Sequence, residues 1–531
     1  MPQAIPTGKK LASPGLITID PFAEEAPMPH PLLQFVHAGR LVSLPGVPPT
    51  RTLLQLLRED LAHSATKEGC NEGDCGACTV VLGERQGGRL KYSTVNSCIR
   101  LAHSIHGMAL WTAADLVQAD GTPHPVQQAL LENHASQCGF CTPGFAMSLF
   151  GLYQNQVLHG QAVSRAQAVQ ALSGNLCRCT GYRPILDAAQ QLDQRPLVLQ
   201  DESNVLLLLE HINEDSKALD ANLSYKQPTD LNQLMAYRAA DPQAQLVAGC
   251  TDVGLWINKG YRDYSSVLDV TRVDDMRQIE VGPDTVSIGA SVTLTDAFDA
   301  LLVDRSQLHS FVHRFAGLPV RNSGTLGGNI ANGSPIGDSM PLLMVLDTRI
   351  ELASQRGTRT LALDTFYTGY RQNQMAPDEV LTRIMVPRPT VNEFLRVYKI
   401  SKRQEDDISA VCLALRLELQ GDRVHSISIA AGGVAATPVR ASKTMAAMHG
   451  QPWTLASIER GVAVLREEFS PISDMRASHH YRKQVLGNLL HRFWLETQGQ
   501  VDIAIDGLAL LDTAVANVPP SDLKGAAHEF P

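Results

Sequence analysis

The most informative stretch of this 531-residue sequence is Glu68-Gly69-Cys70-Asn71-Glu72-Gly73-Asp74-Cys75-Gly76-Ala77-Cys78-Thr79, which is followed after a gap by Cys98. Its cysteines have the C-x4-C-x2-C…C spacing of a plant-type 2Fe–2S site. The glycines favour a tight loop, because glycine adopts positive φ and leaves backbone N–H groups free to approach sulfur. A structural zinc site is more often built from two CxxC knuckles. The spacing therefore predicts a 2Fe–2S cluster held by Cys70, Cys75, Cys78 and Cys98.

The segments around this loop predict a small ferredoxin-like domain. Residues Leu32–His37 and Leu41–Leu44 are typical of a β-hairpin turning at Ala38-Gly39-Arg40. Residues Thr50–Ala62 have the apolar spacing of an amphipathic helix, and Thr79–Gly83 returns to a strand. Two strands, a helix, a cluster loop and a further strand follow one another as in a ferredoxin.

A second cysteine group consists of Cys138-Gly139-Phe140-Cys141 and Cys177-Arg178-Cys179. Each pair precedes a predicted helix, with Thr142 suited to cap and Pro143 and Pro184 near the helix start. Two helix N-termini would direct partial positive charge at one anionic centre. Zinc remains an alternative, but the pattern favours a second 2Fe–2S cluster on Cys138, Cys141, Cys177 and Cys179. The helices expected around it are Pro125–His134, Phe145–Gln154, Arg165–Leu172 and Ile185–Gln191.

Two later stretches are typical of ligand-binding backbone. Residues 246–254 predict a buried strand that ends in a glycine turn before a short helix, and such a turn can approach a pyrophosphate. Residues 322–338 are so rich in Gly, Asn and Ser that we expect a loop wrapped around a polar ligand. A G-x-G-x-x-G motif opening a βα unit is missing, so the sequence does not support a Rossmann fold.

Composition and charge exclude several classes of protein. Lys and Arg number 45 and Asp and Glu 54, so the net charge of −9 argues against a nucleic-acid partner. We find no apolar run long enough to span a membrane and no secretory signal. Eight of the ten cysteines lie between Cys70 and Cys179, unlike a disulfide framework spread over a secreted chain. We expect a cytoplasmic protein without a membrane anchor.

Taken together, these motifs resemble those of the molybdenum hydroxylases, the xanthine dehydrogenase and aldehyde oxidase family. The resemblance rests on the ferredoxin motif, on residues 138–144 (CGFCTPG) and on residues 174–184 (GNLCRCTGYRP), and it extends from about Leu32 to about Val501. In that family two 2Fe–2S clusters relay electrons from a molybdopterin centre to a flavin. The resemblance places the helical-domain cluster nearer molybdenum and the ferredoxin cluster nearer FAD.

The implied fold class is multidomain α+β. The expected units are a flexible extension (1–31), a plant-type ferredoxin (β-grasp) domain (32–112), a four-helix 2Fe–2S domain (113–195), a linker (196–223), a non-Rossmann α+β FAD-binding domain (224–392), a C-terminal α+β flavoprotein domain (393–501) and a tail (502–531).

The resemblance also implies the residues around FAD. It assigns the ADP half of FAD to Leu246, Val247, Ala248, Gly249, Cys250, Thr251, Asp252 and Val253. It assigns the remaining half to Thr325, Gly328, Asn329, Ser334 and Asp338. Phe315 would lie against the flavin ring, Lys399 near the flavin and Tyr370 on the nicotinamide side. Cys250 and Cys412 are otherwise interpreted as a small filler residue and a core thiol.

Fused family members continue into a molybdopterin domain, whereas this sequence ends. We therefore expect no catalytic residue for purine hydroxylation here and a molybdopterin-binding large subunit as partner, in a heterotetramer with two copies of each chain. NAD+ would accept the electrons from hypoxanthine and xanthine oxidation to urate. One alternative is another molybdenum hydroxylase, acting on an aldehyde or N-heterocycle. Another is a non-redox protein with zinc in its cysteine sites and a degenerate flavin domain.

Overall fold

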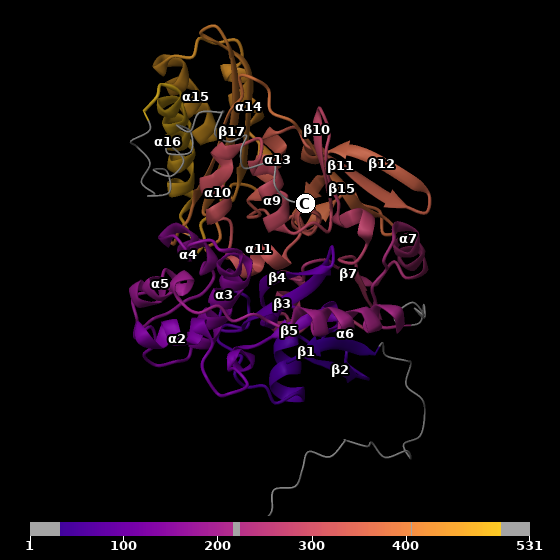
Figure 1. Ribbon diagram of the computed structural model, residues 1–531. Coiled ribbons are helices and arrows are strands. Elements are labelled where there is room, and N and C mark those ends of the chain that lie inside the picture. Colours follow the sequence, from indigo (N-terminus) through magenta and orange to yellow (C-terminus); the bar gives the residue numbers. More distant parts are fainter. Residues whose placement is uncertain (1–31, 216–222, 405, 501–531) are drawn as a thin grey trace, which may run out of the picture.

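The computed structural model describes residues 32–215, 223–404 and 406–500. The N-terminal half of the described chain, indigo to purple in Figure 1, lies beneath the pink to yellow C-terminal half. Four successive units, three of mixed helix and strand and one of helices, confirm the predicted multidomain α+β class. The expected extension 1–31 and tail 502–531 lie outside the described residues.

A five-stranded sheet of order β2-β1-β5-β3-β4 forms the first unit. Parallel pairing of β1 with β5 is flanked by antiparallel neighbours, which is the β-grasp arrangement. The predicted helix 50–62 is shorter than expected: Thr52 caps it, and a π-helical turn over Leu56–Asp60 ends it. The elements are β1 (Leu33–His37), β2 (Arg40–Leu44), α1 (Leu53–Gln55), β3 (Thr79–Gln86), β4 (Arg89–Asn96) and β5 (Ala109–Trp111).

Four helices form the second unit, as predicted, and pack against β3 and β4 through helix α3. Eleven residues of α3 are buried, so this helix is the centre of the bundle. The helices are α2 (Pro125–Glu132), α3 (Thr142–Asn155), α4 (Arg165–Ala171) and α5 (Arg183–Ala189).

The segment predicted as an irregular linker contains a helix, α6 (Glu202–Asp215). Val205, Leu209 and Ile212 are buried at helical spacing, and α6 lies along β1, β2 and β4. Hydrogen bonds from Tyr92 to Glu202 (2.8 Å) and from Asn204 to the Gly39 carbonyl (3.2 Å) hold it there. The apolar stripe is short in a polar sequence, and tertiary packing stabilises it.

The third unit combines two larger sheets with the two-stranded pair β13-β14. A short parallel sheet has the order β6-β8-β7, and a larger antiparallel sheet has the order β12-β11-β15-β10-β9. The dominance of antiparallel pairing agrees with the predicted non-Rossmann fold. The strands are β6 (Tyr225–Lys226), β7 (Gln245–Val247), β8 (Val267–Asp269), β9 (Ile279–Val281), β10 (Thr285–Gly289), β11 (Arg349–Ser354), β12 (Gly357–Ala362), β13 (Tyr367–Gly369), β14 (Gln372–Asn373) and β15 (Val380–Pro387).

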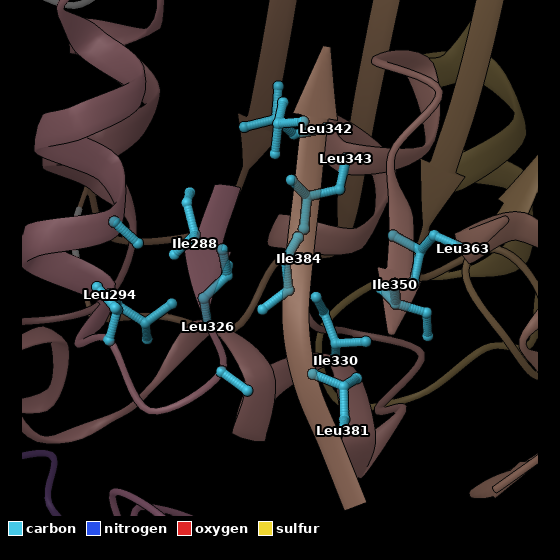
Figure 2. Packing of buried hydrophobic residues seen from close by; sticks show 14 of the residues in the cluster. Ile288, Leu294, Leu326, Ile330, Leu342, Leu343, Ile350, Leu363, Leu381 and Ile384 are labelled. Carbon is cyan, nitrogen blue, oxygen red and sulfur yellow. The ribbon is translucent and has the colours of Figure 1, made fainter. Parts of the chain in front are cut away.

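A hydrophobic core between this sheet and its helices fixes the third unit (Figure 2). Ile288 of β10, Ile350 of β11 and Ile384 of β15 meet Leu326 and Ile330 of helix α12, and all five are fully buried. The helices are α7 (Leu231–Ala240), α8 (Val253–Asn258), α9 (Leu294–Leu302), α10 (His309–Arg314), α11 (Leu318–Ser323), α12 (Leu326–Asn332) and α13 (Ser339–Val345).

The predicted ligand-binding loop 322–338 is largely helical, because α12 occupies its centre. Gly327 is required there for close packing: a Cβ would lie 2.5 Å from the Ala290 carbonyl oxygen. The glycines that suggested a loop instead allow a helix to press against a neighbouring backbone.

The fourth unit is a meander of four antiparallel strands covered by helices. Cys412 lies fully buried on β17, as predicted. The elements are β16 (Phe394–Ile400), β17 (Val411–Gln420), β18 (Arg423–Gly432), β19 (Val439–Arg440), α14 (Ser442–Met448), α15 (Leu455–Glu468) and α16 (His479–Thr497).

Candidate iron–sulfur and flavin sites

The first cysteine group lies in the loop before β3. The backbone N–H groups of Cys70 and Cys75 donate to each other's Sγ, both at 3.3 Å. Gly73 and Gly76 have φ of 80° and 67°, as the loop requires. Gly69 does not have positive φ, contrary to expectation; it is needed because a Cβ would lie 2.7 Å from the Cys75 sulfur.

Sulfur contacts link the four cysteines of this group in a chain, Cys70 with Cys75 and Cys98, and Cys98 with Cys78. Hydrogen bonds from the thiols of Cys75 and Cys98 lower the pKa of Cys70, and a hydrogen bond from Cys98 lowers that of Cys78. Cys78 and Cys98 are almost completely buried, whereas Cys70 and Cys75 are partly exposed. Shared protons among crowded thiols indicate a site prepared for a positively charged centre that would replace those protons.

The second group is more open than the first. Cys138 and Cys179 are exposed, and Cys141 and Cys177 are half-buried. Burial, and a hydrogen bond with Cys177, raise the pKa of Cys141 to about 12. A hydrogen bond with Cys138 raises the pKa of Cys179. The four sulfurs therefore associate as the pairs Cys141–Cys177 and Cys138–Cys179.

This pairing bears on the choice between zinc and iron. A structural zinc ion would need all four thiolates around one tetrahedral centre. A 2Fe–2S cluster instead takes two thiolates on each of two irons. The two sulfur pairs of the second group suit a two-iron cluster, whereas in the first group Cys70 contacts both Cys75 and Cys98, and Cys98 also contacts Cys78.

The helix starts beside the second group differ in detail from those predicted. Cys141 itself is the N-cap residue of α3, and the Thr142 hydroxyl bonds Ser136 Oγ at 2.8 Å. Tyr182, which the sequence analysis did not select, caps α5 with a φ of 67°. Its hydroxyl accepts the Cys177 N–H at 3.0 Å. The sequence signal available for Tyr182 was its position between Cys179, a ligand candidate, and Pro184.

The candidate flavin site is a cavity of about 410 Å³ in the third unit. Residues 246–253 line it together with Thr325, Gly328 and Asn329, so the structure brings these two distant segments to one cavity. A Cβ on Gly249 would lie 1.8 Å from the Ser323 carbonyl oxygen, so only glycine permits this loop to pack there. The volume of this cavity falls within the range of small-molecule binding sites.

Side chains that the sequence analysis did not select complete this cavity. Trp256 and Leu381 line it, as does Asn332, whose amide donates to Asp252 Oδ2 at 2.9 Å. Burial raises the pKa of Asp252, which favours its neutral form beside an anionic ligand. Asn332 lies within the stretch 322–338 and could have been chosen there; Leu381, on a separate strand, left no local signal.

Five other predicted residues lie outside the cavity lining. Phe315 is buried, with its ring edge-to-face against Phe298 at 5.0 Å. Ser334 lies in the turn before α13, where its carbonyl accepts the Gly337 N–H. Tyr370 is 59% exposed, beneath the Arg371 guanidinium. The remaining two, Asp338 and Lys399, form a separate buried network.

Lys399 and Asp338 pair across the boundary between the third and fourth units. Lys399 Nζ donates to Asp338 Oδ2 at 2.7 Å and to Ser409 Oγ at 3.0 Å. The Ser409 hydroxyl donates to the same carboxylate oxygen at 2.8 Å. Among the described residues, the buried Asp338 Oδ1 has no hydrogen-bond partner. It can accept a hydrogen bond from a bound group, which suits a polar cofactor edge.

The first cysteine group adjoins the flavin cavity through helix α8. Asn258, at the end of α8, donates to the Cys98 carbonyl at 2.7 Å. Lys259 donates to the Cys70 carbonyl at 2.7 Å. A Cβ on Gly254, at the start of α8, would lie 2.9 Å from the Ile99 Cα. Helix α8 follows directly on the cavity loop, so this loop and the cluster loop share one helix.

Family models match all four units. A 2Fe-2S iron-sulfur cluster binding domain covers residues 35–101, and a [2Fe-2S] binding domain covers 112–190. The FAD binding domain in molybdopterin dehydrogenase covers 221–389, and the CO dehydrogenase flavoprotein C-terminal domain covers 396–497. These four domains define the chain as an iron–sulfur flavoprotein of the oxidoreductase class.

Individual relatives extend the comparison. Xanthine dehydrogenase of Drosophila subobscura is 32% identical over 93% of this chain and 41% of its own length. Aldehyde oxidase 2 of Mus musculus is 28% identical over 87% of this chain and 39% of its own length. A structure of CO dehydrogenase from Oligotropha carboxidovorans is 26% identical, covering 51% of this chain and 95% of its own, with a TM-score of 0.48.

With these four domains in this order, the chain belongs to the molybdenum hydroxylase family, which includes xanthine dehydrogenase and aldehyde oxidase. It spans about two fifths of the length of the two curated relatives named above. In the described part of the chain, none of the helices combines the length and apolar character that crossing a membrane requires.

Proposed function

We propose that this chain is the electron-transfer subunit of a xanthine dehydrogenase. It would receive electrons from a molybdopterin centre on a partner chain and deliver them through two 2Fe–2S clusters and FAD to NAD+. The overall reaction would be the oxidation of hypoxanthine and xanthine to urate. Bound clusters carry single electrons, whereas FAD accepts two and can pass a hydride to NAD+.

The observation that carries this proposal is the spatial order of the three sites. The second cysteine group has two exposed and two half-buried residues, whereas the first has two half-buried and two buried ones. The first group in turn adjoins the flavin cavity through Asn258 and Lys259. A more exposed group, a more buried group and a cofactor cavity, arranged in that order, suit a relay from an external donor to a flavin.

The chain's own residues would hold the cofactors. Cys70, Cys75, Cys78 and Cys98 would ligate one cluster and Cys138, Cys141, Cys177 and Cys179 the other. Residues 246–253, Thr325, Gly328 and Asn329 would hold FAD in the cavity, whereas Asp338, which does not line this cavity, is assigned to FAD by the family resemblance alone. We propose that the ferredoxin-like, helical 2Fe–2S, FAD-binding and C-terminal flavoprotein domains span residues 32–112, 113–195, 224–392 and 393–501.

The surface around the second group supports docking of a molybdopterin-binding partner. Phe140 and Tyr182 are 49% and 38% exposed beside the exposed thiols of Cys138 and Cys179. Large apolar side chains at an exposed redox site are typical of an interface core. By the family resemblance, we propose a heterotetramer with two copies of each chain.

The proposed electron acceptor is NAD+, and the proposed substrate is a purine. Tyr370 would contact the nicotinamide side, and its exposure beside Arg371 leaves it available to a dinucleotide. Similarity to a xanthine dehydrogenase over nearly the whole chain favours a purine substrate. Similarity to an aldehyde oxidase over a comparable span supports the alternative, an aldehyde or N-heterocycle.

The test is an anaerobic absorbance spectrum of the chain purified with its native partner. Bleaching by xanthine, followed by recovery of colour and formation of NADH when NAD+ is added, is the expected result. A brown protein that NADH bleaches and xanthine does not would retain the clusters and FAD but refute the purine substrate. A colourless protein would refute the electron-transfer function.

A further inference from the structure

The segment Ser173–Cys177 connects the two cysteine groups directly. The Leu176 N–H donates to the Cys75 carbonyl at 3.0 Å. Leu176 precedes Cys177 of the second group, and Cys75 belongs to the first. One backbone hydrogen bond therefore joins a proposed ligand of the first cluster to the residue directly before a proposed ligand of the second.

Asn175 carries the side-chain contacts of this connection. Its Nδ2 donates to the Gly76 carbonyl at 3.1 Å and to Thr79 Oγ1 at 3.3 Å, both in the first cluster loop or directly after it. Its Oδ1 accepts from Ser148 Oγ of helix α3 at 2.6 Å. Asn175 is 4% exposed, so water competes little for these bonds. One side chain thus bonds both the first loop and the helix that begins at Cys141.

Glycine backbones pack against each other at the same place. A Cβ on Gly76 would lie 2.2 Å from the Gly174 carbonyl oxygen, and one on Gly144 would lie 2.2 Å from the Gly76 carbonyl oxygen. Gly76 also has a φ of 67°, which a larger residue would adopt only with strain. The backbones of Gly76 in the first loop, Gly144 at the start of α3 and Gly174 before Cys177 are therefore in direct contact.

The other end of the segment reaches the flavin part of the molecule. The Leu318 N–H donates to Ser173 Oγ at 3.0 Å, three residues beyond Phe315. A Cβ on Gly174 would lie 3.2 Å from the Gly317 Cα. Residues 173–177 thus contact the FAD-binding unit at one end and provide a thiol of the second group at the other.

We propose that Asn175 is a positioning residue that fixes the two iron–sulfur clusters relative to each other. This inference rests on the proposed function, because it requires a cluster in each cysteine group. The side-chain hydrogen bonds of Asn175 go to Gly76, Thr79 and Ser148, none of which is a proposed ligand, so it acts by holding the loops that carry the ligands. Electron transfer between two centres falls steeply with their separation, so the rigidity of this contact sets the efficiency of the relay.

The test compares Asn175→Leu with Ser148→Ala in the complex with the native partner. Leucine has a similar volume and removes all the Asn175 side-chain bonds, whereas Ser148→Ala removes only the bond to α3. Iron content and visible circular dichroism establish that both clusters are built. Electron paramagnetic resonance of the fully reduced protein then measures the magnetic interaction between the clusters, which depends on their separation and orientation.

We expect Asn175→Leu to retain both clusters but weaken or lose the interaction splitting, and Ser148→Ala to retain it. Should Asn175→Leu fail to accumulate, Thr79→Val removes one acceptor of the Asn175 amide and should weaken the splitting less but in the same direction. If the splitting is unchanged in Asn175→Leu, or in Thr79→Val when that variant has to replace it, the inference about Asn175 is wrong while the proposed function stands. Wild-type protein without two reducible clusters would overturn the proposed function as well.

Discussion

Replacing Lys399 by methionine tests the buried ion pair that joins the two flavin units. Lys399 and Asp338 have side chains only 3% and 6% exposed, at a separation of 2.7 Å. Methionine retains most of the aliphatic stem but leaves a buried carboxylate whose Oδ2 keeps only the Ser409 hydroxyl as donor among the described residues. Removing one member of a buried ion pair costs about 3–5 kcal/mol. We expect a loss of that size in the free energy of unfolding.

The chain offers a matched control in Lys91 and Asp296. Their charged groups lie 2.8 Å apart, but the side chains are 42% and 37% exposed. Such a surface pair contributes about 0–1 kcal/mol, so Lys91→Met should change stability little. Urea unfolding followed by circular dichroism and fluorescence measures both variants. A double variant with Asp338→Asn should recover much of the loss, because the unpaired charge is gone. Equal effects of Lys399→Met and Lys91→Met would refute the argument from burial.

Two further predictions concern the cysteines and the pH dependence of stability. Cys98→Ser and Cys179→Ser should each remove half of the iron and one of the two paramagnetic resonance signals. The control Cys412→Ser should retain all of the iron. Loss of both signals from either single variant would contradict the assignment of the cysteines to two clusters. Burial lowers the pKa of His124 from 6.5 to about 4, so the unfolded chain takes up a proton there before the folded one. Stability should fall by up to about 3 kcal/mol as the pH drops through that window, at about 1.4 kcal/mol per pKa unit. His124→Asn keeps an acceptor for the Val126 N–H, which lies 3.2 Å from His124 Nδ1, and should flatten this profile in urea titrations; parallel profiles would refute the assignment.

Local spacing made the cysteine groups predictable. Cys70, Cys75 and Cys78 lie on one short loop, so their distances follow from the chain itself, and glycines at 73 and 76 reveal the turns. The helix start after Cys141 was predictable for the same reason. The fold class followed from the resemblance of these motifs and of the later segments to the molybdenum hydroxylase family.

Features that depend on tertiary contacts could not be predicted in the same way. Helix α6 has only a brief apolar stripe, and it forms because β1, β2 and β4 provide a surface for Val205 and Leu209. Helix α12 contains Gly327 and Gly328, which locally favour a loop, yet Leu326 and Ile330 bury against the antiparallel sheet. In both cases burial of a few large apolar residues outweighs the local preference of the sequence.

Gly76 shows why the relation between the two clusters escapes sequence reasoning. Its positive φ predicts a turn, which explains the residue completely at the level of the loop. The structure adds a second requirement, contact with the Gly174 backbone, which lies far along the chain and carries no side chain that could signal it. Asn175 is the one residue of this contact whose chemistry is visible in the sequence, yet a buried asparagine beside a glycine is also typical of an ordinary turn. The separation of the clusters is therefore encoded mainly by the absence of side chains, and substitutions that merely add a methyl group at Gly76 or Gly144 should disturb it as strongly as loss of a hydrogen bond.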